Sequence, residues 1–163
     1  MKKIKHIFEI EDYQSFDELS PSDRKLLDNA QLACKSAYAP YSKFKVGAAV
    51  LLENGEIVRG NNQENAAYPS GLCAERVAMY YASANYPNIA MLAIAVAVES
   101  DSVGFEKPLA PCGSCRQVMA EYEYLFQIKM RVILSEPGGH VQIINGISDL
   151  LPFTFNAKEL KGL

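Results

Sequence analysis

Three cysteines and one glutamate stand in two short motifs that suit metal chemistry. Glu75 follows Cys73 by two residues, and two residues separate Cys112 from Cys115. Thiolates are ligands that zinc prefers, and a catalytic zinc takes three protein ligands and leaves one position open for water. Bound zinc lowers the pKa of water from about 15.7 to roughly 7, and Glu75 would carry the water's proton to a leaving group. These residue types predict a catalytic zinc site.

The spacing of the motifs predicts where they lie on helices. Residues i and i+2 point to different sides of a helix, so Cys73 and Glu75 would share a target only where the helix begins. The helix dipole and the unpaired N–H groups at such a position also favour thiolate over thiol. We therefore expect two helix N-termini, one at Cys73 and one at Cys112, to converge on one metal ion.

Two other interpretations of the cysteines remain open. A C-x-x-C pair alone is also found in redox proteins and as half of a structural zinc site. With Cys34 as a fourth ligand, a closed and catalytically inert four-cysteine site would form. Cys34 lies on the apolar face of an expected helix, however, where cysteine usually acts as a small hydrophobe. His6 and His140 have no ligand spacing to the cysteines, and we expect both at the surface.

These motifs resemble the cytidine deaminase family, in its three-cysteine zinc form. Beside C-A-E and P-C-x-x-C, the chain carries Y-S-K-F-K-V-G-A-A at 41–49, N-Q-E-N-A at 62–66 and C-G-S-C-R-Q at 112–117. The resemblance covers about residues 20 to 155. It implies hydrolytic deamination of cytidine and deoxycytidine to uridine and deoxyuridine, with one Zn²⁺ per subunit held by Cys73, Cys112 and Cys115 and with Glu75 as the proton carrier.

The resemblance also implies roles for other residues. Phe44 would stack on the pyrimidine ring, Asn62 and Glu64 would bind the ribose hydroxyls, and the Ala74 N–H would donate to the pyrimidine O2. Three thiolates leave a zinc centre at net −1, which weakens its power to acidify water. A guanidinium at Arg76 that donates to a thiolate would partly restore that power of the zinc centre. A homotetramer is implied as well, with the possible inter-subunit residues Tyr41, Tyr68 and Phe155.

The composition suits one soluble globular domain with a small-molecule substrate. The 163 residues are 49% hydrophobic and 21% charged, with a net charge of −3. This acidic balance argues against a nucleic-acid partner. No apolar run approaches the ~18 residues of a membrane span, and the basic N-terminus lacks the apolar run of a signal peptide. We expect a cytoplasmic protein with an N-terminal arm, residues 1–19, and one catalytic domain, residues 20–163.

The hydrophobic pattern predicts a three-layer α/β/α sandwich around a mixed sheet of about five strands. Ser20-Pro21-Ser22-Asp23 is typical of a helix start. The pattern predicts helices over 20–38, 73–85, 112–124 and 147–151, and strands over 44–52, 56–60, 90–98, 128–134 and 141–144. The 90–98 run is apolar throughout, which indicates a central strand buried on both faces. Weak alternation in residues 1–19 suggests a strand-like arm lying on the domain.

Three rival functions remain. A deaminase of a cytosine-nucleoside antibiotic of the blasticidin S type would use the same chemistry, although Asn62 and Glu64 favour an ordinary ribose. A deaminase of bases within polynucleotides would need a cationic and aromatic surface. This acidic chain, which has no tryptophan, offers little such surface. A non-catalytic, zinc-stabilised binding module predicts four cysteine ligands and no effect of replacing Glu75.

Overall fold

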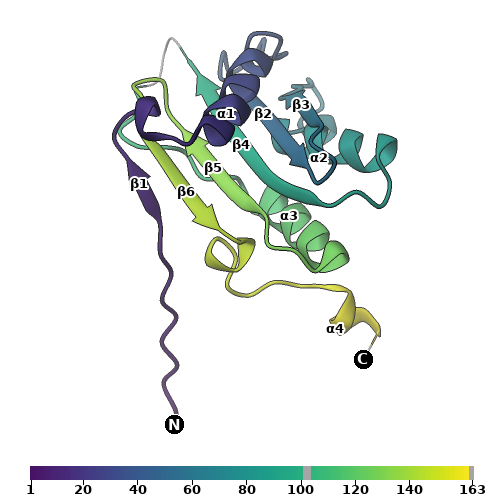
Figure 1. Ribbon diagram of the computed structural model, residues 1–163. Coiled ribbons are helices and arrows are strands. Elements are labelled where there is room, and N and C mark those ends of the chain that lie inside the picture. Colours follow the sequence, from purple (N-terminus) through teal and green to yellow (C-terminus); the bar gives the residue numbers. More distant parts are fainter. Residues whose placement is uncertain (101–103, 162–163) are drawn as a thin grey trace.

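The protein is an α/β sandwich built on one mixed sheet, seen here in a computed structural model that describes residues 1–100 and 104–161 (Figure 1). The six strands lie in the order β1-β6-β5-β4-β2-β3. They are β1 Glu11–Tyr13, β2 Lys45–Leu52, β3 Ile57–Asn61, β4 Met91–Glu99, β5 Arg131–Ser135 and β6 Val141–Asn145. The helices are α1 Pro21–Cys34, α2 Ala74–Asn85, α3 Gly113–Phe126 and α4 Ala157–Lys161, with 3-10 turns η1 Phe16–Glu18, η2 Tyr68–Ser70 and η3 Ile147–Asp149.

Helix α1 covers one face of the sheet because that face carries small side chains. On this side of β2 and β4 the core contains Ala49, Ala93, Ala95 and Ala97. The helix approaches so closely that a Cβ on Gly47 would lie 2.0 Å from the Ala30 oxygen. Glycine is therefore required at this point of contact, and the first layer of the sandwich is set by alanine and glycine.

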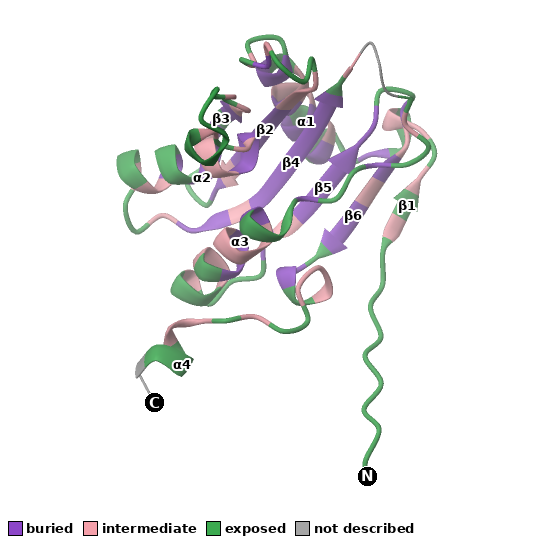
Figure 2. Ribbon diagram, turned by 180° about the vertical axis from the view of Figure 1, so that it is seen from behind, coloured by how far each residue is buried: buried purple, intermediate pink, exposed green. Residues whose placement is uncertain are grey.

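Helices α2 and α3 cover the opposite face, which is lined by larger side chains. Val50 and Ile94 point to this side and pack with Met79 of α2 and Met119 of α3. Alternate residues of β4 thus serve two cores, and Figure 2 shows this strand buried along most of its length. The prediction of a central strand buried on both faces is confirmed, as is the α/β sandwich.

The pairing of β4 with β5 decides where the helix ends meet. These two strands are parallel, whereas the other four pairs are antiparallel. A parallel pair needs a crossover connection, here through α3, which packs on the same face as α2. The N-termini of α2 and α3 consequently lie next to each other.

Several expected boundaries were wrong, for reasons that lie outside the local sequence. Helix α1 ends at Cys34 rather than near residue 38, because Tyr38 pairs with the 62–64 segment through its backbone N–H and C=O. Strand β5 begins at Arg131 rather than at 128, because α3 runs on to Phe126 and ends at a left-handed Gln127, φ 55°. The predicted helix at 147–151 is a single 3-10 turn, and α4 was not foreseen.

The N-terminal segment adds the sixth strand. β1 pairs antiparallel with β6, and the side chain of Asp12 accepts hydrogen bonds from Gln142 at 2.9 Å and meets His140 Nε2 at 2.7 Å. Residues 1–10 form an extended, exposed segment that precedes β1 (Figure 1), and His6 Nε2 lies 3.9 Å from a carboxylate oxygen of Asp149. Among the described helices, none is long and apolar enough to cross a membrane.

Candidate metal and catalytic site

Three cysteine sulfur atoms meet where α2 and α3 begin. Cys73 and Cys112 are the N-cap residues of these helices, both with extended backbone, and Cys115 lies in the first turn of α3. The Sγ atoms of Cys73 and Cys112 are 3.8 Å apart, those of Cys112 and Cys115 are 3.5 Å apart, and all three lie within 4.8 Å of one another. Two ligand atoms on a tetrahedral zinc, each at 2.3 Å, lie about 3.8 Å apart. The cluster therefore fits zinc without rearrangement.

Cys34 does not belong to this cluster. It is buried on the α1 side of the sheet, where its thiol donates to the Ala97 carbonyl at 3.1 Å. Burial raises the pKa of the Cys34 thiol to about 11, so it stays protonated at neutral pH. Among the described residues the ligand set thus contains three cysteines, and the four-cysteine alternative loses its fourth ligand.

The surroundings of Cys73 favour its thiolate form. A hydrogen bond from Cys115 and the nearby Arg76 guanidinium lower the pKa of Cys73 below its ordinary value. The same hydrogen bond, together with burial, raises the pKa of Cys115. The thiolate is the form of cysteine that binds a metal ion.

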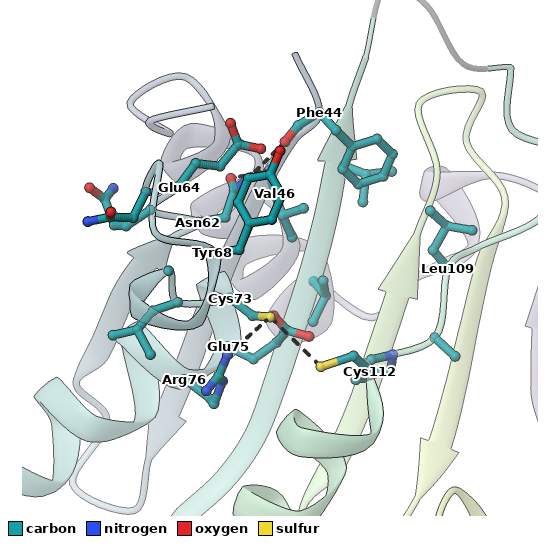
Figure 3. Close-up of a pocket in the computed structure, with 18 residues that line it drawn as sticks. Phe44, Val46, Asn62, Glu64, Tyr68, Cys73, Glu75, Arg76, Leu109 and Cys112 are labelled. Atoms are coloured by element: carbon teal, nitrogen blue, oxygen red, sulfur yellow. Dashed lines mark hydrogen bonds between the residues drawn. The ribbon is translucent and has the colours of Figure 1, made fainter. Parts of the chain in front are cut away.

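Arg76 lies beside the sulfur atoms, as expected for a residue that tunes them. Its Nη2 is 3.6 Å from Cys73 Sγ, and its Nε is buried with no hydrogen-bond partner among the described residues (Figure 3). An unpaired buried donor is costly, and the same guanidinium already donates to the Cys73 sulfur through Nη2. The position of Arg76 in the first turn of α2 places this charge against the cluster.

Glu75 is buried in the first turn of α2, with only 5% of its surface exposed. Burial raises the pKa of its carboxyl group, and the charge on Cys73 acts in the same direction. A carboxyl group with a raised pKa exchanges protons more readily near neutral pH. Glu75 lines the cavity beside the cysteine sulfur atoms (Figure 3), where a proton carrier would stand.

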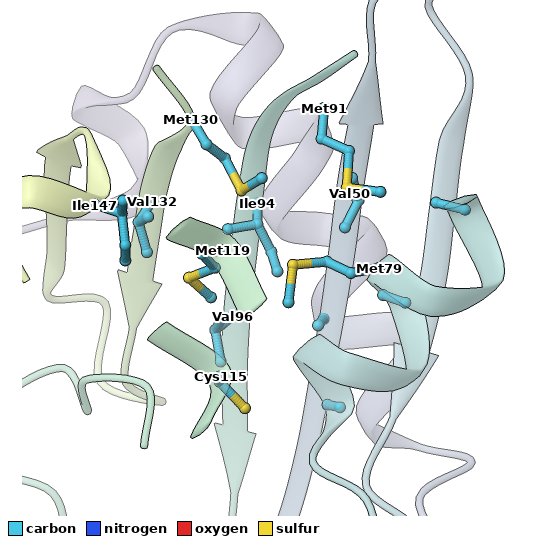
Figure 4. Packing of buried hydrophobic residues seen from close by; sticks show 14 of the residues in the cluster. Val50, Met79, Met91, Ile94, Val96, Cys115, Met119, Met130, Val132 and Ile147 are labelled. Atoms are coloured by element: carbon cyan, nitrogen blue, oxygen red, sulfur yellow. The ribbon is translucent and has the colours of Figure 1, made fainter. Parts of the chain in front are cut away.

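The floor beneath the cluster is hydrophobic and closely packed. Cys115 is fully buried beside Met119 and Val96, and Met79 packs against the same core from α2 (Figure 4). Side chains in such an interior interdigitate with few voids. The two helices that carry the ligands are therefore held in fixed positions relative to the sheet.

A cavity of about 460 Å³ opens over Glu75 and the sulfur atoms. This volume lies in the range of small-molecule sites, and the mixture of apolar walls with a few polar groups is typical of them. The wall is formed by Phe44, Val46, Asn62, Gln63, Glu64, Asn65, Tyr68, Gly71, Leu72, Cys73, Glu75, Arg76, Val96, Val98, Leu109, Ala110, Pro111 and Cys112.

Three of the four expected substrate residues, Phe44, Asn62 and Glu64, line this cavity, and the last two also hold the backbone. The Asn62 side chain accepts from the Val46 N–H at 2.8 Å and donates to the Phe44 carbonyl at 2.9 Å. Glu64 accepts from the Tyr41 N–H at 2.9 Å. Asn62 therefore holds the backbone on both sides of the first residue of β2, and Glu64 holds the turn just before Phe44. Ala74, fully buried, is the first residue of α2, where helix N–H groups lack intrahelical partners.

The three residues expected at subunit contacts are all exposed. Tyr68 lies in the wall of the chain's own cavity, although 77% of its surface is accessible. Tyr41 and Phe155 do not line the cavity, and the Phe155 carbonyl accepts from the Gln117 side chain at 2.6 Å. Their role between subunits stays a prediction.

Sequence reasoning missed the apolar residues of the cavity wall. Val96 and Val98 stand at alternate positions of β4, and period-two spacing was the signal that could have placed them together. Leu109 comes from the segment before α3. Phe105, whose ring packs against Phe44 from the same segment, carried no signal in the sequence.

Comparison with known proteins supports the resemblance to cytidine deaminases. Residues 20–130 match the family described as the cytidine and deoxycytidylate deaminase zinc-binding region. The chain is 42% identical to a cytidine deaminase of Halalkalibacterium halodurans over 85% of this chain and 98% of the relative. It is 40% identical to a cytidine deaminase of Sporosarcina psychrophila over 83% of this chain and 93% of that one.

Solved structures of the same kind share the fold. A crystal structure of cytidine deaminase from Burkholderia pseudomallei matches with a TM-score of 0.72 and 39% identity, over 84% of this chain and all of that chain. The enzyme from Mycobacterium tuberculosis matches with a TM-score of 0.64 and 34% identity, over 83% and 98%. The three-cysteine cluster, the buried Glu75 and these matches lead to one conclusion: the chain belongs to the cytidine and deoxycytidylate deaminase zinc-binding family.

Proposed function

We propose that this protein catalyses the hydrolytic deamination of cytidine and deoxycytidine, which yields uridine or deoxyuridine and ammonia. The observation that carries the proposal is the position of the buried Glu75 in a cavity lined by Cys73 and Cys112, two of the three cysteines whose sulfur atoms are spaced for zinc. The cytidine deaminases that are 42% and 40% identical to the chain support this substrate class.

Cys73, Cys112 and Cys115 would hold one zinc ion at the base of the cavity. Zinc bound there supplies an acidified water, whose pKa falls from about 15.7 to roughly 7. Glu75 would take one proton from the water and pass it to N3 of the pyrimidine while the water oxygen bonds to C4. It would then take the proton left on that oxygen and give it to the amino group, so that the C4–N bond breaks, a carbonyl forms at C4 and ammonia leaves. Arg76 donates to the Cys73 sulfur and offsets part of the negative charge of the three thiolates.

The rest of the cavity would bind and orient the nucleoside. In our proposal the Phe44 ring stacks on the pyrimidine, the Ala74 N–H donates to O2, and Asn62 and Glu64 bind the ribose hydroxyls. All four residues lie at the cavity or at the helix start beneath it. The apolar walls exclude water from the ring and leave these few polar groups to set its orientation.

We further propose a cytoplasmic homotetramer with Tyr41, Tyr68 and Phe155 near the subunit contacts. The exposure of these three aromatic side chains supports the proposal. A reducing compartment suits a site that depends on free thiolates. We also propose that residues 20–163 form the catalytic domain behind an N-terminal arm of residues 1–19, because the family match begins at residue 20.

The test is ammonia release from cytidine by the zinc-loaded protein, with the Glu75→Gln variant measured beside it. We expect the parent to release ammonia and the variant to lose about 10²- to 10⁴-fold in kcat, the range of acid–base catalysis. Zinc content and the circular dichroism spectrum should stay unchanged. Glu121→Gln, at an exposed position of α3, is the matched control and should keep full activity.

Two results would contradict the proposal. Equal rates for Glu75→Gln and the parent would remove Glu75 as the proton carrier. A parent that binds zinc and is folded but leaves cytidine unchanged would exclude the substrate, and release of ammonia from blasticidin S instead would identify the antibiotic-type deaminase.

A further inference from the structure

The Phe44 ring lies in the cavity wall but is only partly held by its own strand. Its backbone is fixed at both ends, because its N–H donates to Ser42 Oγ at 3.0 Å and its carbonyl accepts from Asn62 at 2.9 Å. These bonds leave the side-chain torsions free. A half-buried aromatic at the start of a strand has several accessible rotamers, so something else must select the one that faces the cavity.

Phe105 supplies a second contact to that ring. The two ring centroids are 5.9 Å apart and the planes are inclined by 57°, which is the geometry of a favourable tilted aromatic pair. Phe105 follows β4, and the same segment continues to Leu109, which lines the cavity. Phe44 lines the cavity and Phe105 does not, so Phe105 touches Phe44 from outside the space that a ligand would fill.

We propose that Phe105 is a positioning residue that holds the Phe44 ring toward the cavity and thereby sets the affinity for the pyrimidine nucleoside. The inference rests on the function proposed above. Removing Phe105 would leave the outer side of Phe44 open to water and to other rotamers. Binding would then have to order the ring again, and affinity falls when a contact group is no longer preorganised.

Loss of the Phe105 ring should change the affinity for the nucleoside rather than the rate of the chemical step. An aromatic pair of this kind contributes a factor of about 2 to 12 to an equilibrium constant. The groups that move protons and hold the metal stand on α2 and α3, and the aromatic contact of Phe105 is with Phe44. We therefore expect KM for cytidine to rise about 2- to 12-fold in Phe105→Ala while kcat stays within about twofold.

The experiment compares the zinc-loaded parent with Phe105→Ala, Phe105→Tyr and Phe8→Ala. Phe105→Tyr keeps the ring and should keep the parent's KM. Phe8→Ala removes an exposed phenylalanine of the N-terminal arm and is the matched control for loss of an aromatic side chain. Calorimetric titration of cytidine into Glu75→Gln, with and without Phe105→Ala, measures the same factor as a ratio of dissociation constants where turnover is slow.

The outcomes separate this inference from the proposed function. A parent that deaminates cytidine, together with Phe105→Ala of unchanged KM and unchanged dissociation constant, overturns the inference alone. A fall in kcat with a lower melting temperature overturns it too, because it would show a general structural role. A parent that neither binds nor deaminates cytidine overturns both, whereas a raised KM in Phe105→Ala and restored affinity in Phe105→Tyr support it.

Discussion

Gly60 marks the closest approach of strand β3 to helix α2. A Cβ at this position would lie 2.4 Å from the Ala78 nitrogen and 2.7 Å from the Ala74 oxygen. Side-chain carbons essentially never come within 3.0 Å of such atoms, so Gly60→Ala must push the helix away from the strand. Because Cys73 caps α2 and Glu75 lies in its first turn, the displacement reaches the catalytic groups.

The size of the displacement follows from these distances. Ordinary contact begins at 3.4 Å, so the two contacts must lengthen by about 1.0 and 0.7 Å. A misplacement of about 1 Å costs an active site about 10²-fold in rate. Over-packing of an interior contact costs about 1–3 kcal/mol in the free energy of unfolding. We expect Gly60→Ala to lose both activity and stability by these amounts.

The assay measures kcat/KM for cytidine, zinc content and urea unfolding on the same preparations. Gly104→Ala is the control, because in the part of the chain that the structure describes no atom apart from its chain neighbours lies within 4 Å of its added Cβ, and it should match the parent in activity. Gly60→Ala with kcat/KM within twofold of the parent and unchanged stability would refute the reasoning. Lost stability with full activity in the folded fraction would show that the helix relieves the clash without moving the site.

Two further predictions concern charged groups. Arg76→Gln removes the guanidinium beside the Cys73 sulfur, and we expect zinc affinity or kcat to fall about 10- to 100-fold. Competition with a chelator measures zinc affinity, and steady-state kinetics measure kcat. Unchanged values of both would contradict the prediction. Arg131→Met removes the two hydrogen bonds, at 2.7 and 3.1 Å, that Arg131 donates to the Asp23 carboxylate. The free energy of unfolding at pH 7, measured by urea titration, should therefore fall by about 1–3 kcal/mol. Burial raises the pKa of Asp23, but the hydrogen bonds from Arg131 and Ser20 outweigh it and hold that pKa below its ordinary value. The stability that the parent gains from the ionised, paired Asp23 should therefore be fully present above about pH 3.9, the unfolded pKa, and should be lost as the pH falls through the lower folded pKa. A parent–variant difference that grows in acid would contradict the assignment.

Much of the fold could be predicted because the signals for it are local. The cap at Ser20 and the apolar run that became β4 each act within a few residues of chain. The errors fell where distant segments compete with local preference. The pairing of Tyr38 with the 62–64 segment ended α1 early, and the Glu123 side chain, which accepts from the Met130 N–H at 2.7 Å, holds the turn before β5.

Residue types alone identify the chemistry of the site, because the type of a residue decides which atoms can bind a metal or move a proton. Cys73, Glu75, Cys112 and Cys115 carried that information in their types and spacing. Packing in the folded protein decides which of these side chains come into contact. The parallel pairing of β4 and β5 brings the two helix starts together, and the sheet separates Cys34 from the other thiols. Contacts across the fold depend on packing between segments far apart in the chain, and spacing along the chain does not encode them.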